Sequence, residues 1–163
     1  MTSATLGAAR VSGPTSFVVE GYVGGVRCLI MFDNGASTCF GDEDWMQRHG
    51  MQFEQLDDPL LVETANSQKI PVATEALSEL CIESVRTPVR LKPMKNMLKG
   101  VQVILGMDWL HKYDVDIKCG QMKAKLKVLG KKHVLKALPY TDSESIGPGC
   151  AALKALHTEP VNK

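Results

Sequence analysis

The sequence lacks the features that mark most membrane and secreted proteins. Its 163 residues contain no run of about eighteen apolar residues, the length that a membrane-spanning helix needs. The first ten residues, 1–10, lack the basic start and the apolar centre of a signal peptide. We therefore expect a soluble protein that resides in the cytoplasm and has no membrane partner.

Cysteine is too scattered for a disulfide framework or a zinc site. The five cysteines are odd in number, widely spaced and without a C-x-x-C pair, and they are Cys28, Cys39, Cys81, Cys119 and Cys150. Most of them lie on apolar, strand-like stretches, so we interpret them as reduced core residues. We predict no metal ion and no cofactor.

Familiar catalytic motifs are absent as well. The chain has no G-x-S-x-G elbow and no G-x-x-x-x-G-K-[ST] loop, and its four histidines fall in no ligand spacing. A Cys39 nucleophile served by one of these histidines stays open, because such partners need not be neighbours in the sequence. Trp45 and Trp109 lie in short helical stretches, where we expect them to anchor packing.

Length and periodicity favour one all-β domain with tails. At 163 residues and 44% apolar content, the chain is long enough for one core and too short for two domains. We assign residues 15–138 to the domain, 1–14 to a flexible N-terminal segment and 139–163 to a flexible C-terminal tail. Alternating patterns predict strands at 16–22, 26–32, 60–72 (a hairpin), 76–82, 88–91, 102–105, 115–118, 122–128 and 133–138. Short helices are predicted at 42–49 and 107–112.

Charge is segregated along the chain. Residues 1–83 carry four Lys/Arg against twelve Asp/Glu, whereas residues 84–136 carry thirteen against three. In 122–128 the lysines alternate with apolar residues, which is the pattern of a strand with one solvated face. Exposed lysines also discourage edge pairing between chains. We therefore do not expect direct contact with nucleic acid.

Asp33 is the most informative residue. It follows the apolar run Cys28 to Phe32 and begins the sequence Asp33-Asn34-Gly35-Ala36-Ser37. Asn34-Gly35 is also a strong signal for a two-residue hairpin turn with both residues at positive φ. The small and hydroxyl residues that come next favour a crowded loop instead, since a hairpin strand would resume alternation. A second apolar strand, 101–105, ends at Gly106 and runs into Met107-Asp108-Trp109-Leu110.

These segments resemble the retropepsins, and most closely the aspartic proteases of gypsy-type long-terminal-repeat retrotransposons. Residues 31–36 are similar to the family's apolar-apolar-Asp-Thr/Ser-Gly-Ala motif, 62–67 to its flap, and 103–110 with 115–117 to its apolar-apolar-Gly segment and C-terminal helix. The resemblance covers roughly residues 15–138 and extends, more weakly, to the protease domain of the DNA-damage-inducible ubiquitin-shuttle proteins.

The resemblance implies a closed acid-protease barrel that forms a homodimer and cuts a polypeptide. Asp33 would be the catalytic residue, paired with Asp33 of a second chain. The substrate cleft would be lined by Asn34, Gly35, Ala36 and Ser37. The flap that closes over the substrate would include Thr64, Ala65, Asn66 and Ser67.

Asn34 departs from the family pattern, which has Thr or Ser at this position. The sequence therefore leaves two functions open. The first is an aspartic endopeptidase that processes a retroelement-type polyprotein. The alternative is a catalytically weak or silent domain that keeps the fold for dimerisation or peptide binding by strand addition.

Overall fold

The computed structural model describes residues 16–64, 66–97, 100–139 and 157–160. Strands dominate these residues: β1 (Phe17–Val23), β2 (Val26–Phe32), β3 (Phe40–Asp42), β4 (Glu54–Glu63), β5 (Lys69–Ile82), β6 (Val85–Met94), β7 (Val103–Leu105), β8 (Asp116–Lys118), β9 (Lys123–Val128), β10 (Lys131–Lys136) and β11 (His157–Pro160). The described helices are short, α2 (Glu43–Arg48) and α3 (Met107–Lys112). The predicted all-β class is confirmed. No helix in the described ranges is long and apolar enough to cross a membrane.

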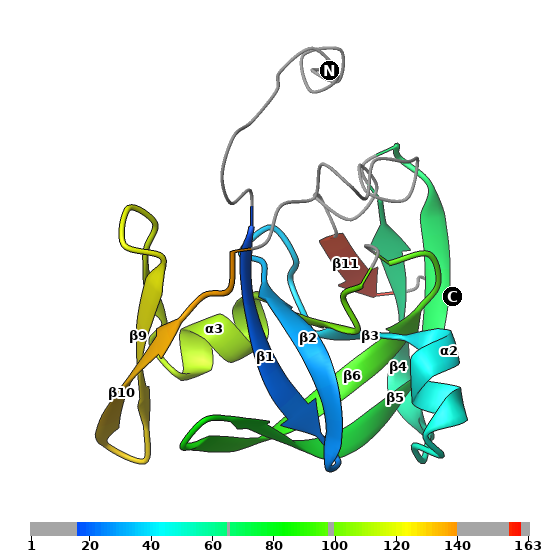
Figure 1. Ribbon diagram of the computed structural model, residues 1–163. Helices are drawn as coiled ribbons and strands as arrows, with labels where there is room; N and C mark the ends of the chain where they lie inside the picture. The colour runs from blue at the N-terminus through cyan, green and yellow to red at the C-terminus, as the bar shows by residue number, and fades with distance from the viewer. Residues whose placement is uncertain (1–15, 65, 98–99, 140–156, 161–163) are drawn as a thin grey trace.

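Most of the strands form one curved sheet that closes into a barrel. Its order is β1-β2-β7-β3-β6-β5-β4-β11, and β1 also pairs with β5. The ring is therefore made of β1, β2, β7, β3, β6 and β5, and β4 and β11 extend from it. A separate sheet, β10-β9-β8, stands beside α3 on the left of Figure 1. Closure leaves the ring without open edges, and the β4–β5 hairpin with α2 lies on its opposite side (Figure 1).

Local turn chemistry explains the hairpins. Gly24 and Gly25 join β1 to β2 with φ of 59° and 81°, the left-handed pair that a tight hairpin turn requires. The turn between β5 and β6 is shorter than predicted, because pairing continues to Ile82 and Val85 and leaves only Glu83 and Ser84 between the strands. Glu83 accordingly takes a positive φ of 52°.

The helices follow their sequence signals. The Asp42 carboxylate caps α2 by accepting a 3.0 Å hydrogen bond from the Trp45 amide, which satisfies one of the helix's free N–H groups. Gly50, at φ 68°, follows the end of that helix. Trp45 and Trp109 are both buried in the main core, as predicted.

The strand pattern of β9 also agrees with the sequence. Ala124 and Leu126 are buried whereas Lys123, Lys125 and Lys127 are exposed, so the lysines occupy the solvated face of the β10-β9-β8 sheet. Cross-strand register places Lys123 opposite Lys136 and Lys127 opposite Lys132. The face is therefore mostly basic, with Asp116 on β8 and the exposed Val134 on β10 as exceptions opposite Lys125.

Two strands and two cysteines differ from the sequence-based expectations. β3 is too short to show a period, and it is fixed by pairing with β6 and β7. β11 lies in the segment that we expected to be a flexible tail, where four residues pair with β4. Cys28 and Cys39 are buried as expected, but Cys119 is exposed and Cys81 is half-buried.

Candidate active site

The two motifs meet because β2 and β7 are parallel neighbours. Their register places Ile30 opposite Val103 and Phe32 opposite Leu105, so both strands end at the same edge of the sheet. The chain then continues into Asp33 on one strand and Gly106 on the other. The Asp33 amide donates a 3.0 Å hydrogen bond to the Leu105 carbonyl, which fixes the start of the loop against β7.

The residues after Asp33 form a tight turn that orients its carboxylate. The Gly35 amide donates to Asp33 Oδ1 at 2.8 Å, and the Ala36 amide donates to the Asp33 carbonyl at 3.2 Å. This is an Asx turn, in which the side chain takes the place of a backbone acceptor. Asp33 is half-buried, and its Oδ2 atom is shielded from solvent.

The hairpin interpretation of Asn34-Gly35 is wrong. Neither residue is among those with positive φ, which a two-residue hairpin turn of this type would require. The strands on either side, β2 and β3, are not paired with each other, because β7 lies between them. The turn instead ends one strand and directs the chain across the carboxyl end of its neighbour.

Gly106 lets the two loops approach at backbone distance. The Met107 amide donates to the Ala36 carbonyl at 2.7 Å, and the Asp108 amide donates to the Ser37 carbonyl at 3.3 Å. A Cβ atom at Gly106 would lie 2.1 Å from the Thr38 carbonyl oxygen and 2.7 Å from that of Ala36. Such contacts are impossible without moving the backbone, so glycine is required there by space alone.

A polar network lies under this loop. The Thr38 hydroxyl donates to Asp108 Oδ2 at 2.6 Å and accepts a 3.1 Å hydrogen bond from the Lys92 ammonium. Lys92 is itself buried and forms a 3.2 Å ion pair with Glu75 Oε1. The network therefore connects the Asp33 loop to β6 and to β5. β5 is the second strand of the β4–β5 hairpin, which contains the predicted flap residues.

Sequence reasoning missed most of this network. Asp108 was noticed only as part of a motif, whereas Thr38, Lys92 and Glu75 were not singled out. These residues come from separate elements and share no spacing. Lys92 gave no signal in the sequence, because it falls in the same polar register of β6 as Arg86 and Arg90, and only its burial in the structure sets it apart.

The setting of Cys39 disfavours a role as a nucleophile. Its thiol is buried and donates a 3.3 Å hydrogen bond to Asp108 Oδ1. Burial, with the negative charge of Asp108 beside it, holds the Cys39 pKa far above its ordinary value, so the reactive thiolate is disfavoured. Burial likewise raises the pKa of Cys28 to about 12.

Replacing Lys92 with Met should destabilise the fold by about 2 kcal/mol, because the half-buried Glu75 carboxylate and the buried Thr38 hydroxyl would each lose the hydrogen bond that Lys92 donates. Met keeps most of the side-chain volume, so the loss reports the network more than the packing. Urea unfolding monitored by tryptophan fluorescence measures the change. Lys127→Met, on the exposed face of β9, is the control and should leave the midpoint unchanged. Equal midpoints for both variants would show that the network adds no stability.

The predicted flap residues form the tip of the β4–β5 hairpin. The Thr64 amide donates to the Gln68 carbonyl and the Ser67 amide donates to the Thr64 carbonyl, each at 2.9 Å. The Thr64 hydroxyl also donates to the Asn66 side chain. Asn66 and Ser67 are exposed, whereas Thr64 is buried. Ala65 lies outside the described residues.

The flap strands share a core with the Asp33 loop. Val62 of β4 and Val72 of β5 belong to the same buried cluster as Met31 and Ala36. The Ala36 side chain is fully buried in this cluster, and its place in the substrate cleft stays a prediction. Ser37 is half-buried and Asn34 is exposed.

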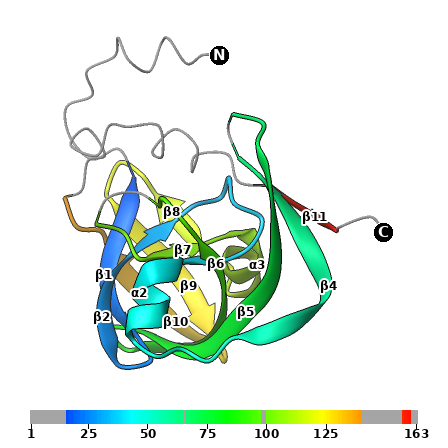
Figure 2. The same ribbon diagram turned by 90° about the vertical axis from the view of Figure 1, so that its right-hand side faces the viewer.

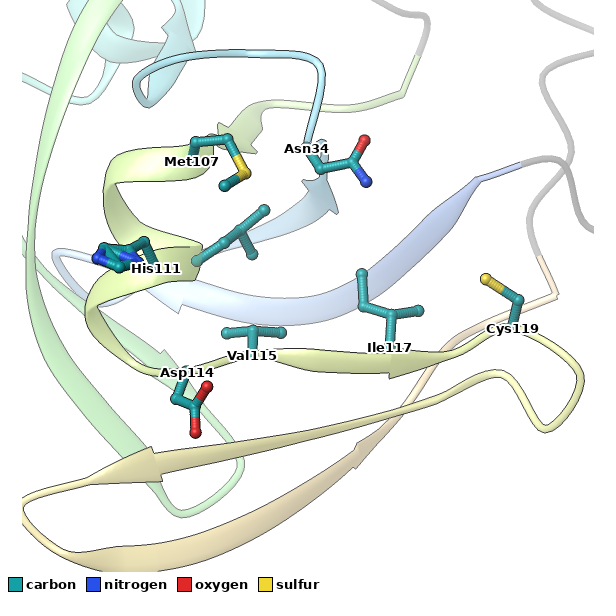
Figure 3. Close-up of a pocket in the computed structure, with 8 residues that line it drawn as sticks. Asn34, Met107, His111, Asp114, Val115, Ile117 and Cys119 are labelled. Atoms are coloured by element: carbon teal, nitrogen blue, oxygen red, sulfur yellow. The ribbon is translucent and has the colours of Figure 1, made fainter.

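An open pocket of about 450 Å³ lies beside Asn34 (Figure 3). It is bounded by the loop after β2, by α3 and by the segment that leads into β8. Its lining residues are Asn34, Met107, Leu110, His111, Asp114, Val115, Ile117 and Cys119. Met107, at the start of α3, is 43% exposed in this lining. Among the described side chains, no group of three or more His, Cys, Asp or Glu could hold a metal ion.

Comparison with known proteins agrees with this geometry. A family model described as retroviral aspartyl protease matches residues 8–132. The fold is similar to the crystal structure of the retroviral protease-like domain of Ddi1 from Leishmania major, with a TM-score of 0.55 and 12% identity. That match covers 80% of this chain and 94% of the other. No curated protein gives a significant match.

Proposed function

Because the chain belongs to the retroviral aspartyl protease family, we propose that it is an aspartic endopeptidase in which two identical chains each contribute Asp33. The observation that carries this proposal is the setting of Asp33. Its backbone is fixed by the Leu105 carbonyl and its Oδ1 by the Gly35 amide, at the end of a buried strand. The carboxylate is thus preorganised, which a catalytic group requires.

The chemistry requires a second carboxylate. Two carboxyl groups held close together cannot both ionise, so they share a proton. One polarises the carbonyl of the peptide bond while the other removes a proton from the attacking water. The Asp-x-Gly-Ala motif occurs once in the sequence, so the second Asp33 comes from another chain across a two-fold axis.

The pocket beside Asn34 is the surface on which the second chain would pack. It adjoins the Asp33 loop and is open to water in the single chain. Its apolar lining comes from Met107, Leu110, Val115 and Ile117. Burying such a surface favours association. A two-fold axis near Asn34 would bring the two Asp33 carboxyl groups together.

The substrate that suits this arrangement is an extended polypeptide. The β4–β5 hairpin would close over it and exclude water, as lids do in other enzymes. We further propose that the natural substrate is a polyprotein of the retroelement type, on the basis of the family assignment.

Peptide cleavage as a function of pH tests the proposal. The purified chain, incubated with a library of long apolar peptides from pH 4 to pH 7, should cleave with a bell-shaped profile and an optimum below neutrality, because one carboxyl must be protonated and the other ionised. A statine-type mimic of the transition state should inhibit, whereas thiol reagents should not. Peptide binding without cleavage at any pH would favour the silent, peptide-binding alternative.

Asn34→Thr should strengthen the dimer and raise turnover. A Thr hydroxyl donates and accepts from a single atom on a stiff β-branched stem, whereas the Asn amide divides these roles between two atoms. Each hydrogen bond that the Thr hydroxyl would make to the backbone of the second chain contributes about 1 kcal/mol, and symmetry doubles this to about 2 kcal/mol, so the dimer Kd should fall about thirtyfold. Sedimentation equilibrium measures the Kd. Asn34→Ser provides the second comparison, and equal or weaker association in both variants would show that the amide already serves the interface.

A further inference from the structure

β4 has one edge that faces away from β5, and this edge is regular only along its last four residues, 60–63. On its inner side β4 pairs with β5, but the register shifts between Gln55 and Leu60, so the strand is interrupted there. The interruption contains Asp57, Asp58 and Pro59, and charges, proline and bulges are the devices that keep a strand edge from pairing. Residues 60–63, Leu-Leu-Val-Glu, contain neither proline nor a bulge, and their one charged residue is Glu63 at the end of the strand.

β11 occupies that stretch of edge. Its four residues pair antiparallel with β4, from His157 opposite Glu63 to Pro160 opposite Leu60. Figure 2 shows β11 on the outer side of β4, at the end of the large sheet.

This edge belongs to the part of the flap nearest the Asp33 loop. Glu63 leads directly into the turn at Thr64, and Val62 is fully buried in the cluster that contains Ala36. An extended peptide that adds to a free strand edge gains main-chain hydrogen bonds whatever its sequence. A substrate strand and the 157–160 segment would therefore compete for the same row of backbone groups.

We propose that residues 60–63 of β4 form a peptide-docking edge, and that the chain's own segment 157–160 is its resident occupant and limits access of substrate to the flap. We infer the docking from the strand pairing alone. The effect of the docked segment on substrate access rests on the proposed function.

Pro160 indicates which residue to change. Proline has no N–H, so in a paired strand its nitrogen faces away from the neighbour, and the N–H groups that face β4 then fall at the alternate residues, His157 and Glu159. Glu159→Pro removes such a donor, whereas Glu159→Ala keeps it and serves as the control.

Hydrogen exchange in the full-length Asp33→Asn chain tests the docking without interference from cleavage. The amides of Leu61, Glu63, His157 and Glu159, which face the other strand in this register, should be protected. Glu159→Pro should speed the exchange of the Leu61, Glu63 and His157 amides about tenfold or more, while Glu159→Ala leaves it unchanged. An unprotected His157 or Glu159 amide, or equal exchange in the two variants, would overturn the proposal. Protection lost on dilution would also overturn it, because the occupant would then come from a second chain.

Kinetics of the chain with Asp33 intact test the effect on substrate. If the segment occupies the edge nine-tenths of the time, Glu159→Pro should lower KM about tenfold and leave kcat unchanged. Protection in a chain that cleaves nothing would support the docking and overturn only the proposed function. Cleavage with an unchanged KM would show that the docked segment does not limit access, and would overturn that part of the proposal.

Discussion

Asp33→Asn should lower kcat/KM for peptide cleavage by at least about a thousandfold, the scale expected when an acid–base group is lost. Asn has nearly the shape of Asp, and its amide oxygen can still accept the hydrogen bond from the Gly35 amide. The loop should therefore keep its structure. The variant loses the proton that the two carboxyl groups share. A neutral amide can neither take a proton from the attacking water nor donate an acidic proton to polarise the carbonyl of the peptide bond.

Asp116→Asn is the matched control for this experiment. Asp116 is exposed on β8 and forms an ion pair only with the exposed Lys118 among the interactions described. This change should leave both kcat and KM within experimental error of the parent chain. Residual cleavage by Asp33→Asn at more than a tenth of the parent rate would rule out Asp33 as the catalytic group.

Gly106→Ala should destabilise the fold by about 3 kcal/mol, at the upper end of what overpacking costs. The added methyl group would overlap the Thr38 and Ala36 carbonyl oxygens, and both belong to backbone that is held by hydrogen bonds to the β7–α3 segment. Relief would require the Asp33 loop to separate from Gly106. Activity should therefore be lost together with stability.

Gly120→Ala provides the control, because a Cβ atom at Gly120 would meet nothing within 4 Å. Urea unfolding by circular dichroism should show a lower midpoint for Gly106→Ala and an unchanged one for Gly120→Ala. An unchanged midpoint for Gly106→Ala would mean that the two loops do not approach as closely as the structure places them.

Several elements could be predicted from the sequence because their causes are local. The β1–β2 hairpin follows from Gly24-Gly25, the two residues that accept a positive φ at no cost. The bounds of α3 agree with the predicted 107–112. α2 lies within the predicted 42–49, since Asp42 caps its start and Gly50 follows its end. Each of these signals lies within a few residues of the structure that it determines.

Asp33 could be singled out because an acid directly after a buried strand needs a reason to be there. The arrangement around it could not be worked out in the same way. Asn34-Gly35 by itself is equally compatible with a hairpin turn, and that alternative is excluded by the backbone φ of the two residues and by the insertion of β7 between β2 and β3. The parallel pairing of β2 with β7 involves segments about seventy residues apart, and no local pattern encodes such a register.

The sequence by itself thus determined the strand-rich class, the short helices, the local turns and the acid on which the proposed chemistry depends. Tertiary structure alone decided what surrounds that acid: the contact between Gly106 and Thr38, the polar chain of Glu75, Lys92, Thr38 and Asp108, and the occupant of the β4 edge. The physical reason is the range of the interactions. Turns and caps depend on backbone preferences of adjacent residues, whereas close approach, ion pairing and edge pairing depend on which distant segments the closed barrel brings together.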